Sequence, residues 1–110
     1  MQQLSSMQET LALSGNAPAV SEVFAAAYAP NVAAWVKAGT GVTAYVVRVK
    51  GSLAQDQDTV NWPTILEITF ADDANVAPKW LTGFAPGRFK FIQAEIVSVT
   101  GGTVDVYVLN

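Results

Sequence analysis

The sequence predicts an all-β fold, an antiparallel two-sheet β-sandwich that is jelly-roll-like and carries a short flexible N-terminal arm. Three observations predict it. About seven or eight short segments alternate between apolar and polar residues, which is the two-residue period of a half-buried strand. Turn signals rich in Gly, Pro, Asn and Asp lie between these segments and recur roughly every 8 to 15 residues. The chain has no cysteine, so an immunoglobulin-like sandwich, which stays open as the alternative, would lack its usual disulfide.

The N-terminal third begins with the arm, residues 1–7, which are mostly polar. Residues 10–14 alternate and predict a short strand that ends at a Gly-Asn turn. Residues 19–28 fit helical spacing as well as an extended strand, and their surroundings favour the strand. A strand over 32–37 follows, and the two glycines of residues 38–41 suit a turn that requires positive φ.

The middle of the chain holds the clearest strand pattern, over residues 42–50. Its inward side chains are Tyr45, Val47 and Val49, whereas the outward positions include both basic residues of the segment. A second strand is predicted over 62–70, with its apolar side chains inward and its polar ones outward. One face of each strand therefore belongs to the core.

The C-terminal part predicts three more strands. The weak strand over residues 76–81 contains Pro78, which confines it to a sheet edge. Within 88–99 the apolar side chains change parity, and such a change indicates a β-bulge. The Gly-Gly turn at 100–103 leads into a final strand over 104–109, and the two strands around this turn are predicted to pair as a β-hairpin.

The composition indicates one domain, residues 1–110, because this length is typical of a single domain. Apolar residues make up 51% of the chain and charged residues only 14%, which excludes a disordered chain. So few charges leave some apolar surface that a partner is expected to cover.

Enzyme chemistry of the usual kinds is excluded by the absence of histidine and cysteine, because no serine-hydrolase triad and no ordinary zinc site can be assembled. Two pairs of carboxylates stay open as alternatives. Asp56 and Asp58 lie in an acidic loop that could hold calcium, and Asp72 and Asp73 adjoin a turn. A solvated loop is the favoured interpretation, so the sequence predicts no enzyme, no catalytic residue, no cofactor and no metal.

Nucleic-acid and membrane partners are not expected. The six basic residues are spread along the chain and the net charge is −3, so no basic cluster is available for phosphates. The longest uncharged stretch, residues 23–36, is broken by Pro30 and does not fit a spanning helix. No basic residue precedes Lys37, so no secretory signal is visible and synthesis in the cytoplasm is expected.

The three tryptophans, Trp35, Trp62 and Trp80, allow two interpretations. Aromatic residues at strand positions are usually core or interface anchors. The alternative is a platform on which sugars stack, as in a carbohydrate-binding module.

The C-terminal two thirds of the chain contain a distinctive series of elements. They are a strand that ends in Gly-Ser, an acidic loop, a tryptophan before the next strand, an aromatic and basic segment, a Gly-Gly turn and a closing strand. In this chain those elements are Val47-Val49-Gly51-Ser52, Asp56-Gln57-Asp58, Asn61-Trp62, Arg88-Phe89-Lys90-Phe91, Val97-Ser98-Val99-Thr100-Gly101-Gly102-Thr103 and Val104-Asp105-Val106. In this pattern the chain resembles small virion proteins of tailed phages and prophages.

The resemblance implies a capsid decoration protein, also called a cement protein, with a β-sandwich fold. Such a protein binds the major capsid protein on the outside of the virion shell and pairs with itself as a homo-dimer or homo-trimer, which matches a symmetry axis of the shell. Several joined protomers gain avidity even when each binds weakly. The alternative function is a carbohydrate- or receptor-binding module of a phage head or tail fibre.

Overall fold

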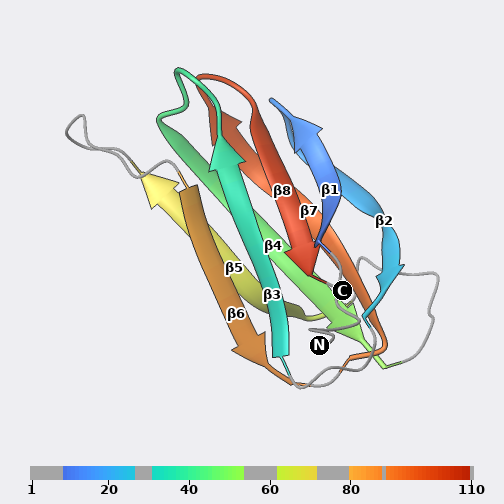
Figure 1. The fold of residues 1–110 in the computed structure, drawn as a ribbon. Coiled ribbons are helices and arrows are strands. Elements are labelled where there is room, and N and C mark those ends of the chain that lie inside the picture. The colour runs from blue at the N-terminus through green and yellow to red at the C-terminus, as the bar shows by residue number, and fades with distance from the viewer. Residues whose placement is uncertain (1–8, 27–30, 54–61, 72–79, 88, 110) are drawn as a thin grey trace, which may run out of the picture.

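A computed structural model describes residues 9–26, 31–53, 62–71, 80–87 and 89–109. Within these ranges the secondary structure is entirely β (Figure 1). The strands are β1 (Glu9–Gly15), β2 (Ala19–Ala25), β3 (Asn31–Ala38), β4 (Ala44–Ser52), β5 (Thr64–Ala71), β6 (Trp80–Pro86), β7 (Phe91–Thr100) and β8 (Val104–Leu109).

The strands form two four-stranded sheets with the orders β1-β8-β3-β6 and β2-β7-β4-β5. Every neighbouring pair is antiparallel. The pairing is nested: β4 pairs with β5, β3 with β6, β2 with β7 and β1 with β8. A long hairpin wound over on itself in this way is a jelly roll. The predicted fold class is confirmed.

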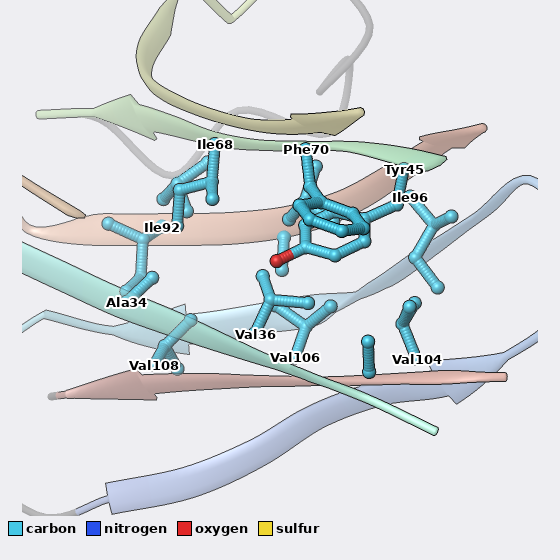
Figure 2. Close-up of a cluster of buried hydrophobic side chains, with 14 of the residues drawn as sticks. Ala34, Val36, Tyr45, Ile68, Phe70, Ile92, Ile96, Val104, Val106 and Val108 are labelled. Atoms are coloured by element: carbon cyan, nitrogen blue, oxygen red, sulfur yellow. The ribbon is translucent and has the colours of Figure 1, made fainter. Parts of the chain in front are cut away.

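The core fills the space between the two sheets, and Figure 2 shows its side chains meeting from both sides. The β1-β8-β3-β6 sheet contributes residues of small and medium size, and the β2-β7-β4-β5 sheet contributes larger ones. Those without solvent exposure are Ala34, Val36, Tyr45, Val47, Ile92, Ala94, Ile96, Val104, Val106 and Val108. Burying one such Val or Ile side chain is worth about 1.5–3 kcal/mol, so this layer supplies most of the drive to fold.

The strand patterns predicted from alternation are confirmed where one face is buried. Tyr45, Val47 and Val49 point into the core from β4, and Ile68 and Phe70 do so from β5. The ambiguous segment after residue 19 is a strand through Ala25. Its predicted continuation to residue 28 lies partly outside the described residues, as does the arm.

The parity change predicted in β7 is also confirmed. Val46 of β4 lies opposite Ser98, but the next residue, Val47, lies opposite Ile96, so Val97 is the extra residue of a bulge. Before the bulge, Ile92, Ala94 and Ile96 face the core. After the bulge the core-facing positions change parity, and Val99 packs against the core.

The predicted hairpin between β7 and β8 is wrong. These strands lie in different sheets, and residues 101–103 carry the chain across the sandwich. The β3–β4 connection crosses beside it, as the upper end of the molecule in Figure 1 shows. The two turns are bound to each other: Gly39 N donates to Thr103 O at 2.9 Å, and Thr43 N donates to Thr100 O at 2.9 Å.

The edge strand β6 differs from its predicted bounds. The prediction stopped at Leu81, whereas the strand spans Trp80–Pro86, and residues 76–79 lie outside the described part. The strand continues through Gly83, where side-chain atoms of Leu66 and Ile68 occupy the space that a Cβ would need. The predicted position at a sheet edge is confirmed.

Candidate functional site

The outer surface of the β1-β8-β3-β6 sheet is rich in apolar and aromatic side chains. They alternate along their strands with core residues, and they lie opposite one another in cross-strand rows. We call this surface the aromatic face; it comprises Leu11, Ala33, Trp35, Phe84, Tyr107 and Leu109. Two of its side chains are strongly exposed, Leu11 at 49% and Phe84 at 68%. Large apolar side chains grouped on an outer sheet face are typical of an interaction surface.

A stacked aromatic pair lies at the centre of this face. Trp35 and Tyr107 are directly opposite each other on β3 and β8, with ring centroids 4.4 Å apart and planes 10° from parallel. The indole Nε1 of Trp35 donates a hydrogen bond to the Glu9 carboxylate on β1. Ring stacking adds about 0.5–1.5 kcal/mol beyond area burial, so the pair is held in one orientation. Such a preorganised anchor loses little entropy when a partner binds.

Charged groups lie at one end of the aromatic face. Ser14 Oγ donates to Asp105 Oδ1 at 2.6 Å, and Lys37 lies opposite Asp105 in the sheet register. Glu9 lies at the opposite end, so charged residues flank the apolar side chains at both ends of the strands. Protein interfaces commonly have this arrangement.

The outer surface of the other sheet is different, because charged side chains cross it in ladders. Arg48 pairs with Glu67 at 2.8 Å, and Lys50 pairs with Glu95 at 3.6 Å. The hydrogen bond that Arg48 donates to Glu67 raises the pKa of Arg48 above its ordinary value, so the guanidinium stays charged. The Arg48–Glu67 pair is exposed and contributes little stability, whereas the side chains of the Lys50–Glu95 pair are mostly covered.

Three buried polar atoms have no hydrogen-bond partner within the described part of the chain: Tyr45 Oη, Trp62 Nε1 and Gln93 Oε1. Burial raises the pKa of Tyr45 to about 12, which keeps the phenol neutral. Its ring packs inside the core against Phe70, with centroids 5.4 Å apart (Figure 2). A neutral phenol in an apolar core cannot meet a substrate, so we assign the Tyr45 hydroxyl no chemistry.

The three tryptophans and the two carboxylate pairs singled out from the sequence lie in different places. Trp35 lies on the aromatic face, and Trp62 is buried, with 6% of its surface exposed. Trp80 begins β6, but its side chain is outside the description. The carboxylate pairs at positions 56, 58, 72 and 73 lie outside it as well.

Two further structural findings concern metals and membranes. Within the described ranges, no three Asp or Glu side chains come together in a way that could hold a metal ion. The same ranges contain no helix with the length and apolar character needed to cross a bilayer.

Sequence reasoning missed Leu11 and Phe84 as exposed residues. The signal for the rest of the aromatic face was present, because Trp35 and Tyr107 occupy outward positions in the strand alternation, where polar residues are usual. Phe84 was not recognised as a strand residue, because the strand over residues 76–81 was predicted to end before it.

No protein-family model matches the chain, and no curated protein matches it in sequence. Two solved structures have a similar fold. One is the K3 cleaved adhesin domain of Lys-gingipain from Porphyromonas gingivalis, with a TM-score of 0.56 and 12% identity over 84% of this chain. This chain spans 63% of the length of that domain. The other is the SPBc2 prophage-derived protein YomS, with a TM-score of 0.51, 14% identity and full coverage of both chains. At these identities the likeness concerns the fold.

Proposed function

We propose that the chain is a phage virion structural protein, a capsid decoration protein that binds the outside of the capsid shell as a small homo-oligomer and stabilises it. The contrast between the two outer sheet faces carries the proposal. One face carries two ion pairs, and the other offers exposed apolar side chains around a fixed aromatic pair. In this proposal the aromatic face contacts the major capsid protein, and the chain has no catalytic site.

Two further observations support the proposal. The fold is that of many capsid proteins, in which a rigid sandwich presents a surface with little ordering cost. The similarity to a prophage-derived protein extends over the full length of both chains.

The test compares two charge substitutions on opposite faces. Leu11 and Val20 are large exposed apolar residues, at 49% and 56%, and each lies on the outer surface of a different sheet. Leu11→Asp places a carboxylate in the aromatic face and should weaken binding at least about tenfold, because a charge desolvated at an interface is costly. Val20→Asp makes the same change on the charged face and should leave binding intact.

The measurement is co-sedimentation with shells assembled from the major capsid protein of the same genome, together with the thermal stability of those shells. Circular dichroism of each variant checks that the fold is kept. Equal losses in the two variants, or no binding by the parent protein to any form of the shell, would remove the proposed role.

A carbohydrate-binding module is the second candidate, and the stacked Trp35–Tyr107 pair favours it as a sugar platform. The adhesin domain of Lys-gingipain, which has a similar fold, is consistent with it. Trp62 does not fit this role, because it is buried. Glycan-array binding that Trp35→Ala abolishes, with folding unchanged, would favour this candidate over the first.

A further inference from the structure

Among the residues that the structure describes, the sandwich has four edge strands, β1, β6, β2 and β5, and they are not equivalent. Edge strands expose unpaired backbone groups, and proteins blunt them with bulges, charges or proline to prevent pairing with other chains. The register along β1 shifts between Leu11 and Leu13, and that along β2 shifts between Val20 and Val23. On β5, Ile65 is skipped in the pairing with β4. By contrast, β6 pairs with β3 over seven consecutive residues without a shift.

The same contrast holds for charge. Each bulged edge strand carries a glutamate: Glu9 on β1, Glu22 on β2 and Glu67 on β5. The sequence of β6, WLTGFAP, has no charged residue, and its single proline, Pro86, is the last residue of the strand. Its outward side chains Thr82 and Phe84 are exposed, Phe84 at 68%. A regular, uncharged edge with an exposed aromatic residue is suited to pairing with another strand.

We propose that β6 pairs antiparallel with β6 of a second copy of this chain about a two-fold axis, which joins two four-stranded sheets into one continuous sheet. The charges on the edge strands indicate which strand β6 pairs with. A two-fold axis brings a strand against itself, so any charged residue near its middle meets its own like charge. Self-pairing of β2 would do this with Glu22, and self-pairing of β5 would do it with Glu67. On β6 no such repulsion arises.

The register follows from the length of the strand. The seven residues of β6 overlap fully when the axis passes through Gly83, the central residue. Thr82 then lies opposite the partner's Phe84 on the outer surface, in the row that also holds Trp35. The exposed phenyl ring is covered, and the two aromatic faces become neighbours on one side of the dimer.

This inference rests on the proposed function, in which the chain acts as a small homo-oligomer, and it assigns the contact that makes the oligomer. One edge of seven residues buries less than the roughly 1,200–2,000 Å² of stable complexes, so the dimer is weak in dilute solution. On a shell with many equivalent sites, such a weak link is sufficient because linked protomers gain effective concentration.

The experiment measures self-association of the full chain by sedimentation velocity, in a concentration series up to the millimolar range. Thr82→Lys adds a charge to the proposed contact and should weaken dimerisation by about tenfold or more, because like charges are brought together across the axis. Thr69→Lys is the matched control: Thr69 is also an exposed, outward threonine of an edge strand, but in the other sheet. It should dimerise like the parent.

Cross-linking tests the register independently. The chain has no cysteine, so introduced thiols have no competitors. A mixture of the Thr82→Cys and Phe84→Cys variants should form disulfide-linked dimers faster than either variant alone, because these positions lie opposite each other only between copies.

A parent protein that is monomeric throughout the series would overturn the inference, and so would equal weakening by Thr69→Lys or an absence of preferential cross-linking. These results are separable from the shell-binding test. A dimer that binds no shell removes only the decoration role. A monomer that binds shells keeps the decoration role but removes the β6 contact and the homo-oligomer.

Discussion

At the scale of single residues, the Tyr45 hydroxyl is the clearest conflict between side-chain chemistry and environment. The ring fills the centre of the core, but its oxygen is buried without a partner in the described chain. An unsatisfied buried polar group costs about 1–3 kcal/mol, so Tyr45→Phe should stabilise the protein by roughly 1 kcal/mol near neutral pH. Urea unfolding of the two proteins measures the difference.

The advantage of Tyr45→Phe should grow in alkali. In the unfolded chain the phenol ionises near pH 10, whereas in the folded protein its pKa is about 12. The folded pKa is the higher one, so the parent keeps its stability below pH 10 and loses on the order of 2 kcal/mol as the pH rises from 10 to 12. The Tyr107→Phe variant retains Tyr45, so its stability should fall between pH 10 and 12 as that of the parent does. A phenylalanine variant that unfolds more readily than the parent at pH 7 would contradict this account.

At the scale of elements, the two crossing turns at residues 39–43 and 101–103 depend on glycine. Gly41 and Gly101 have φ values of 93° and 96°, a region that favours glycine. A Cβ on Gly101 would lie 2.2 Å from the carbonyl oxygen of Gly41. Backbone strain and overpacking together should make Gly101→Ala destabilising by about 2–4 kcal/mol.

The control for this substitution is Gly15→Ala at the end of β1. A Cβ there has no heavy atom within 4 Å, and its backbone is not in the left-handed region. Its effect should be within about 0.5 kcal/mol of the parent. Chemical denaturation of both variants measures the two changes in stability. Similar losses of stability in the two variants would show that the contact between the turns contributes little to the stability of the fold.

The same turns explain why the strands were predictable but their pairing was not. Alternation in β4 and β8 was visible because each strand buries one face, and burial selects apolar residues at every second position. A Gly-Gly turn after β7 carries no equivalent information, because a short turn can reverse a chain within one sheet or take it across to the facing sheet. The long-range pairs of β8 with β1 and β3 decide between these outcomes.

At the scale of the whole molecule, the sequence predicted an interaction surface but not its position. Trp35 and Tyr107 occupied visible outward positions, but only the strand order places them in one row. Phe84 lies on the same face because β6 pairs with β3 beyond Leu81, where the predicted strand ended. Packing between sheets is not encoded in any local pattern, so the face became apparent only in three dimensions.

The difference between the two outer faces also predicts how shell binding responds to salt. Docking through the aromatic face depends on apolar burial, which ionic screening leaves largely intact, so affinity should change less than about threefold between low and high sodium chloride. Docking through the face that carries Arg48, Glu67, Lys50 and Glu95 would instead weaken steeply as salt rises. Titrating shells with the parent protein and with Arg48→Gln separates these outcomes: we expect both proteins to bind alike across the series. A steep loss of affinity with salt, abolished by Arg48→Gln, would move the contact to the charged sheet.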